Sequence, residues 1–160
     1  MKKIVLPNDI LLGEVERLLR SGTSVTIRTK GSSMLPFIVG GRDSVVLVPY
    51  NGCPLAGDIA LARLSGNIYV LHRILSVSNL GKVTLMGDGN IHGREYCNVN
   101  DLCGKVVIII RNGRNVNTGS RRFVFFSYFW LWLLPVRRIL LAVYRRLHII
   151  NHNQVDEKNI

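Results

Sequence analysis

The chain has 160 residues, of which 48% are hydrophobic and 19% charged, and its formal net charge is +11. This length suits one domain or one domain with an appendage, and a core can be buried without a metal ion or a disulfide. The hydrophobic content excludes disorder over most of the chain. Three cysteines without a CxxC pair exclude a disulfide scaffold and give no signature of a zinc or redox site, so no cofactor is expected.

The positive charge is concentrated in the last third of the chain. Residues 1–101 contain 11 Lys and Arg against 8 Asp and Glu, whereas residues 102–155 contain nine Lys and Arg and no acidic residue. An anionic partner is therefore expected for the C-terminal part. The N-terminus shows no secretory signal, because Lys2 and Lys3 are followed by a short apolar run, Pro7 and then acidic residues.

In chain order, residues 8–20 are predicted to form a helix, because apolar residues recur on one of its faces. The apolar period then becomes that of strands, and glycine turns separate most of them. Six strands are expected, over residues 25–29, 44–48, 59–64, 68–75, 82–86 and 104–111. Residues 31–41, with three Gly and one Pro, should form a loop. The fold is predicted to be mainly β, a β-rich domain over 23–111 preceded by a leading helix within 1–22.

The last third of the chain differs from the β-rich part in its composition and in its apolar pattern. Residues 112–122 are polar and basic and are expected to be a linker, and residues 123–136 are rich in Phe, Tyr and Trp. Pro135 should end or kink a helix there. Helical spacing resumes over 136–147, with aliphatic residues on one face and arginines on the other.

Two interpretations fit this C-terminal pattern. A helix in a membrane interface shows it, and so does a helix that packs its apolar face on the β domain and leaves its arginines in solvent. The aromatic residues favour the membrane, so residues 123–150 are expected to be a membrane-associating segment, with lipid bound through 123–147, and residues 151–160 a polar tail. The window without charged residues, 123–136, has fourteen residues and is short for a full crossing, which favours an interfacial or re-entrant anchor. The same apolar content makes lipid a better partner than nucleic acid, which is not expected.

Three residue types in the β-rich part could support acyl transfer by nucleophile, base and orienter. Ser33 lies in a Gly/Ser loop, where most serines only form turns. His72 lies in a predicted strand, where a buried histidine bonded to a carbonyl is the commoner case. Asp88 precedes Gly89, and Asp-Gly is also an ordinary turn dipeptide. Spacing alone does not bring the three together.

Four segments, taken in order, resemble the signal peptidase I family and its clan, which also holds LexA-like repressors. They are Gly31-Ser32-Ser33-Met34-Leu35-Pro36, Gly57-Asp58-Ile59, Leu71-His72-Arg73-Ile74 and Gly87-Asp88-Gly89-Asn90. The resemblance covers about residues 30–107 and implies a small β-barrel-like catalytic domain. A histidine at the position of the base is similar to the archaeal and endoplasmic-reticulum branch; the bacterial branch uses lysine.

The resemblance also implies roles for individual residues. Ser33 would attack the scissile carbonyl, and its backbone N–H would help to form the oxyanion hole. His72 would take the serine proton and return it to the leaving amine, and Asp88 would orient or support the site. The substrate-binding and oxyanion region would include Gly31, Ser32, Met34 and Pro36.

The sequence departs from the family in three respects. The further acidic pair of the endoplasmic-reticulum relatives is replaced by the stretch 91–95, so the third catalytic residue could be Asp88 or Glu95, or the site could be a dyad. Gly31 stands where some bacterial members place a hydroxyl. The usual N-terminal anchor is replaced by a hydrophobic segment after the β domain. The catalytic domain is therefore expected to be cytosolic, and the three cysteines, Cys53, Cys97 and Cys103, fit a reducing compartment.

The leading interpretation is a membrane-associated serine endopeptidase that cuts a leader or signal-like segment from a peptide or protein precursor. Small residues just before the cut are expected only by resemblance. One alternative is an inactive, membrane-anchored peptide-binding module. A LexA-like self-cleaving regulator is disfavoured, because one short helix, and no helix-turn-helix, precedes the domain.

Overall fold

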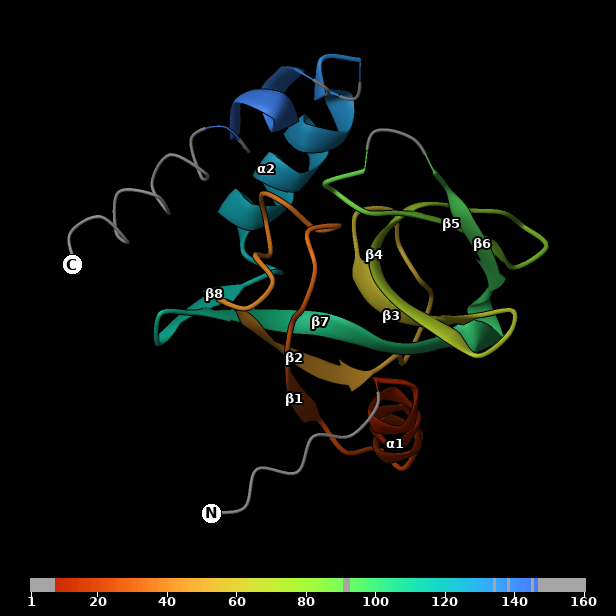
Figure 1. The fold of residues 1–160 in the computed structure, drawn as a ribbon. Coiled ribbons are helices and arrows are strands. Elements are labelled where there is room, and N and C mark those ends of the chain that lie inside the picture. The colour runs from red at the N-terminus through yellow and green to blue at the C-terminus, as the bar shows by residue number, and fades with distance from the viewer. Residues whose placement is uncertain (1–7, 91–92, 134, 138, 145, 147–160) are drawn as a thin grey trace.

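The computed structural model describes residues 8–90, 93–133, 135–137, 139–144 and 146 (Figure 1). The expected leading helix is α1 (Asn8–Arg20). The six expected strands are β1 (Val25–Arg28), β2 (Ser44–Pro49), β3 (Ile59–Leu64), β4 (Ile68–Val77), β5 (Lys82–Met86) and β7 (Leu102–Arg111). Elements that were not predicted are strands β6 (Glu95–Asn98) and β8 (Arg114–Asn117) and the short 3-10 helix η1 (Val99–Asp101).

All the strands join one antiparallel sheet, which confirms the mainly β fold. The order is β1-β2-β7-β3-β4-β5-β6, and β8 pairs with β7. Irregular registers at Val46/Leu47, Leu61/Ala62 and Ile74/Ser76 increase the local twist. The sheet curls into a half-barrel (Figure 1).

Helix α1 packs against one face of the sheet beside β1, β2 and β7. Val15 and Leu19 on its apolar stripe join the main core, which includes Val45 and Leu47 of β2. Alternate residues of β2 are buried, as the two-residue period of a half-buried strand requires. Gly104 permits this packing, because a Cβ there would lie 2.9 Å from both Leu19 Cδ1 and the carbonyl oxygen of Val48.

The polar stretch 112–122 differs from the expected linker. Asn112 and Gly113 both have positive φ, as in a two-residue hairpin turn. They join β7 to β8, with Arg111 opposite Arg114. Ser120 then caps helix α2 (Arg121–Trp132), accepting a hydrogen bond from Phe123 N. The stretch is therefore a sheet edge and a helix cap.

Helix α2 packs on the β domain through a few of its aromatic residues. The Phe37 ring contacts Phe123 and Trp130, with ring centroids 5.5 and 6.1 Å apart. Tyr128 donates to the carbonyl of Ala56 at 3.2 Å. No helix in the described part of the chain is long and apolar enough to cross a bilayer.

Among the helical residues after α2, several aliphatic side chains are exposed and one arginine is buried, which is the reverse of ordinary amphipathic packing. Val136, Ile139 and Val143 are exposed, whereas Arg137 is only 1% exposed. The Arg137 guanidinium stacks on Trp130 at 5.1 Å and donates to its carbonyl at 3.2 Å. For Val136, Ile139, Val143 and Arg137, the alternative in which the aliphatic face packs on the β domain and the arginines face solvent is therefore wrong. Arg146 is exposed, however, and Leu141 is buried. Leu147 and Arg145 lie outside the described residues.

Candidate active site

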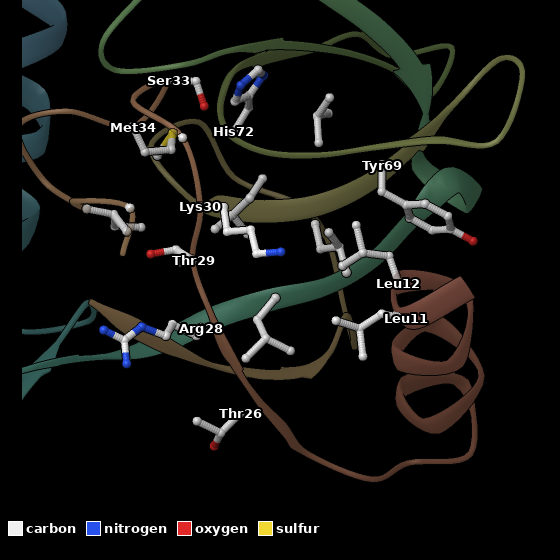
Figure 2. Close-up of a pocket in the computed structure, with 17 residues that line it drawn as sticks. Leu11, Leu12, Thr26, Arg28, Thr29, Lys30, Ser33, Met34, Tyr69 and His72 are labelled. Carbon is white, nitrogen blue, oxygen red and sulfur yellow. The ribbon is translucent and has the colours of Figure 1, made fainter. Parts of the chain in front are cut away.

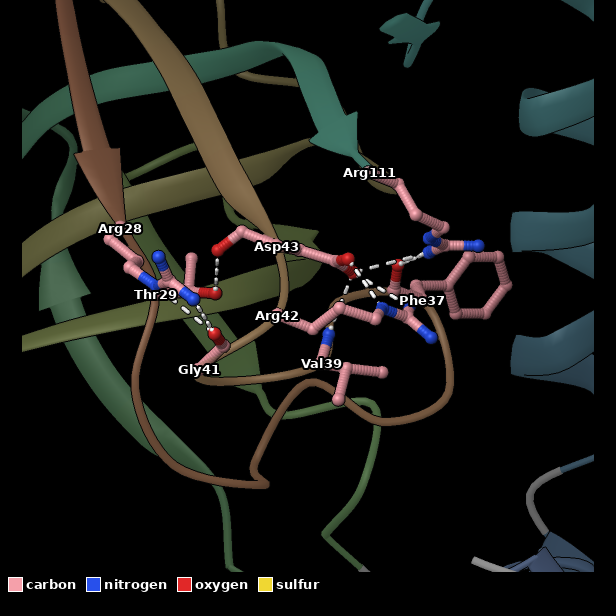
Figure 3. Close-up of polar contacts among 8 residues, drawn as sticks. All are labelled: Arg28, Thr29, Phe37, Val39, Gly41, Arg42, Asp43 and Arg111. Carbon is pink, nitrogen blue, oxygen red and sulfur yellow. Dashed lines mark hydrogen bonds and ion pairs between the residues drawn. The ribbon is translucent and has the colours of Figure 1, made fainter. Parts of the chain in front are cut away.

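The loop that carries Ser33 is closed at its base by Asp43. Thr29 donates to the Asp43 carbonyl from both its backbone N, at 3.1 Å, and its hydroxyl, at 2.8 Å. The buried carboxylate of Asp43 accepts from Val39 N and from the Arg42 side chain, and Arg111 reaches it at 3.3 Å. Figure 3 shows this cluster between the two ends of the loop. The sequence interpretation missed it, because the contacts join residues up to 68 positions apart.

The turn over residues 87–89 packs directly on the loop that carries Ser33. Gly89 N donates to the Ser33 carbonyl at 2.7 Å. A Cβ on Gly87 would lie 2.4 Å from the Ser33 carbonyl oxygen, and one on Gly89 would lie 2.4 Å from that of Ser32. Both glycines are therefore needed so that two backbones can touch.

Arg73 links three of the four segments singled out in the sequence, because it lies in one and bonds to Gly57 and Asp88 of two others. Its guanidinium binds both carboxylate oxygens of Asp88, at 2.8 and 2.7 Å, and the Gly57 carbonyl at 2.7 Å. It also lies over the Phe37 ring, 4.9 Å from the centroid. Arg73 and Asp88 are 0% and 1% exposed, and a buried pair of this kind requires such complete bonding. Asp88 thus supports the 87–89 turn.

The imidazole of His72 has a different carboxylate partner. Its Nδ1 lies 2.9 Å from Glu95 Oε2, and the His72 side chain is 7% exposed. Glu95 begins β6 opposite Leu85 of β5, and β5 in turn pairs with β4 from Arg73 onward. Sheet order thus brings Glu95 to His72 across 23 residues of sequence. Of the two carboxylates left open by the sequence, Glu95 is the one bonded to the imidazole, whereas Asp88 is bonded to Arg73.

Ser33 and His72 line the same end of a cavity of about 500 Å³. Figure 2 shows the two side chains at that end, and residues of β1, β4 and α1 farther along it. Asp58 lies in the segment Gly57-Asp58-Ile59. It accepts a hydrogen bond from the Tyr50 hydroxyl and forms an ion pair with Lys105. It therefore supports the fold behind the site.

The other residues expected around the nucleophile divide into two groups. Gly31 and Met34 line the cavity, and Met34 is buried. Ser32 and Pro36 are outside its lining; the Leu35–Pro36 bond is cis. His92, the neighbouring histidine in the sequence, lies outside the described residues.

An ionic cluster supports the cavity where α1 meets β4. Tyr69 donates to Glu16 at 2.6 Å, and Arg20 donates to the same carboxylate at 2.8 Å. Burial raises the pKa of Glu16, but these hydrogen bonds outweigh it and the pKa is lowered overall. Burial and the Glu16 carboxylate raise the pKa of Tyr69 to about 12. Among the described residues, no three His, Cys, Asp or Glu side chains group as metal ligands.

Comparison with family models and with curated proteins assigns the chain to no family. No protein-family model matches the chain, and no similar sequence is found among curated proteins.

Proposed function

We propose that this protein is a serine endopeptidase of signal-peptidase type that removes a leader or signal-like segment from a peptide or protein precursor. One observation carries the proposal: Ser33 lines the same end of a cavity as His72, whose Nδ1 bonds to Glu95. Nucleophile, base and orienting carboxylate are the parts required for acyl transfer.

The proposed reaction uses these groups in sequence. Glu95 holds Nδ1 of His72, so Nε2 takes the proton of Ser33 as its Oγ attacks the scissile carbonyl. The tetrahedral intermediate collapses when His72 returns this proton to the leaving amine, and the C–N bond breaks. Water, deprotonated by His72, then attacks the ester on Ser33; the ester C–O bond breaks, and His72 returns the proton to Ser33 Oγ. Backbone N–H groups of the nucleophile loop, that of Ser33 among them, would stabilise the oxyanion.

Two strand edges beside the cavity support a peptide substrate. β1 is the end strand of the sheet. β5 pairs with β4 only from Arg73 to Val77, so residues 68–72 have no neighbouring strand on that side in the described structure. An extended chain laid between these edges could pair with either backbone, as in β-strand addition.

We further propose that the protein works at a membrane surface, with its catalytic domain in the cytosol. Phe125, Phe126 and Trp132 of α2 are 66, 56 and 76% exposed, and Arg121 and Arg122 at its start are exposed too. Aromatic residues flanked by arginines suit the headgroup region of anionic lipid.

The test compares protein N-termini in cells that carry the wild type, Ser33→Ala or His72→Ala. New N-termini that appear with the wild type and vanish with both variants would establish the peptidase and give its cleavage rule. The same N-termini in all three, with folded and correctly localised protein, would overturn the proposal in favour of an inactive peptide-binding module.

A further inference from the structure

The cavity beside Ser33 is much larger than a small substrate side chain needs. Its volume is about 500 Å³, whereas a dry cavity of about 150 Å³ already holds benzene. It extends from Ser33 and His72 to Leu11 and Leu12 on α1 (Figure 2). An alanine methyl group placed near Ser33 would leave most of this space empty.

Most of the buried lining is apolar. The buried polar residues in it are Thr29, whose hydroxyl is bonded to the Asp43 carbonyl, and His72 at the Ser33 end. Met34 and Leu61 are 4% and 1% exposed. Leu12, Ile27, Tyr69 and Leu71 pack on the main core but remain only half-buried. The polar residues of the β1 side, Thr26 and Arg28, are exposed. A large apolar group in the cavity would complete the burial of these four half-buried side chains.

The half-buried residues come from three elements that face a common space. Ile27 lies on β1, Tyr69 and Leu71 on β4, and Leu12 on α1. A substrate strand between β1 and β4 advances about 3.3 Å per residue, and alternate side chains point to the same face. A side chain within about three residues of the scissile bond is therefore close enough to enter.

We infer that the protein selects precursors with a large apolar residue, such as Leu, Ile, Met or Phe, close to the cleavage site. This inference rests on the proposed peptidase function. It differs from the small residues that the family resemblance implies, because α1 and β4 here enclose a long apolar cavity.

The experiment uses the purified full chain in detergent and a library of synthetic peptides whose cleavage sites are read by mass spectrometry. The variant Leu12→Trp fills the cavity from α1, and Leu12→Ala enlarges it. Ile10→Trp is the matched control, because Ile10 is 56% exposed on the same helix and outside the cavity lining. Circular dichroism checks that each variant is folded. The same library is also bound to Ser33→Ala, which tests the cavity without catalysis.

We expect wild-type cleavage to favour peptides with Leu, Ile, Met or Phe over Ala near the cut by about tenfold or more. Leu12→Trp should abolish this preference, Leu12→Ala should shift it to larger residues, and Ile10→Trp should leave it unchanged. Cleavage beside small residues without apolar enrichment, or an unchanged preference in both Leu12 variants, would overturn the inference and leave the peptidase standing. Apolar-selective binding by Ser33→Ala without wild-type cleavage would overturn the peptidase alone. Neither cleavage nor selective binding would overturn both.

Discussion

His72 Nδ1 lies 2.9 Å from Glu95 Oε2, and His72 lines the same cavity as Ser33. The two residues come from β4 and β6, strands separated by β5 in the sheet. This contact fixes one tautomer of the imidazole, the one with its proton on Nδ1 and a basic Nε2.

We expect Glu95→Gln to lower the cleavage rate about 10²- to 10⁴-fold, because an amide no longer selects that tautomer or stabilises the imidazolium. The rate is measured on the precursor that the N-terminal comparison identifies. Glu14→Gln is the control, since Glu14 is exposed on α1 and forms an ion pair with the exposed Arg17. A Glu95→Gln enzyme with wild-type kcat would exclude Glu95 from the site.

A second prediction concerns the close contact of the 87–89 turn with the nucleophile loop. Gly89→Ala places a methyl group 2.4 Å from the Ser32 carbonyl oxygen, so the loop must move. We expect about 1–3 kcal/mol of destabilisation and a loss of cleavage larger than that stability loss explains. Urea unfolding and the cleavage assay are compared for this variant and for Gly13→Ala. Gly13 has only the Tyr69 hydroxyl near, at 3.9 Å. Unaltered cleavage by Gly89→Ala would separate this turn from catalysis.

The sequence was sufficient to predict the elements that carry a clear apolar period. The stripe containing Val15 and Leu19 predicted α1, and the apolar run of strand length over 44–48 predicted β2. β6 and β8 were not predictable in the same way. Glu95–Asn98 and Arg114–Asn117 contain mostly polar residues, and they become strands only because β5 and β7 offer them an edge.

The residues of the candidate site could be predicted from the sequence, but the contacts between them could not. Ser33, His72 and Asp88 followed from the family resemblance. Which of Asp88 and Glu95 contacts His72 depended on sheet order, which single-sequence patterns do not give. The burial of Arg137 depended on the Trp130 ring that receives it, a contact outside any helical period.

A third prediction uses the buried carboxylate of Asp43. Burial raises its pKa, but hydrogen bonds from Arg42 and Val39 and the charge of Arg111 outweigh this and lower the pKa below its ordinary 3.8. Because the folded pKa is the lower one, this stabilisation is complete above the ordinary pKa. It is lost as the pH falls through the lowered value.

We therefore expect the free energy of unfolding of the wild type to decrease as the pH drops below about 4. Asp43→Asn should remove that part of the pH dependence and cost about 3 kcal/mol at pH 7, since it leaves Arg42 and Arg111 without their carboxylate. Urea unfolding of both proteins between pH 3 and 7 checks this. Equal slopes for the two proteins in acid would contradict the assignment to Asp43.

A fourth prediction tests whether α2 supports the site. Trp130 Nε1 donates to the Asp88 carbonyl at 3.0 Å, next to the glycine that bonds to Ser33. Trp130→Phe keeps an aromatic ring and removes the donor, so we expect about 1 kcal/mol of destabilisation and a lower kcat. Trp132→Phe, at a position 76% exposed, should change neither quantity. Equal kcat values for the two variants would show that α2 does not position the 87–89 turn.

The last prediction concerns the exposed aromatic face of α2. We expect the wild type to float with anionic vesicles, and Phe125→Ser with Trp132→Ser to weaken this at least about tenfold, since each lost ring removes about 1.5 kcal/mol or more of apolar burial. The control pair Ile68→Ser and Leu80→Ser removes side chains that are 58 and 88% exposed elsewhere, and it should float like the wild type.

A salt series adds a second criterion. Binding to DNA through arginines would fall steeply with salt, whereas apolar insertion retains binding at high salt because screening acts only on the charges. Equal flotation of both double variants, or binding to DNA alone, would exclude the α2 face as a lipid contact.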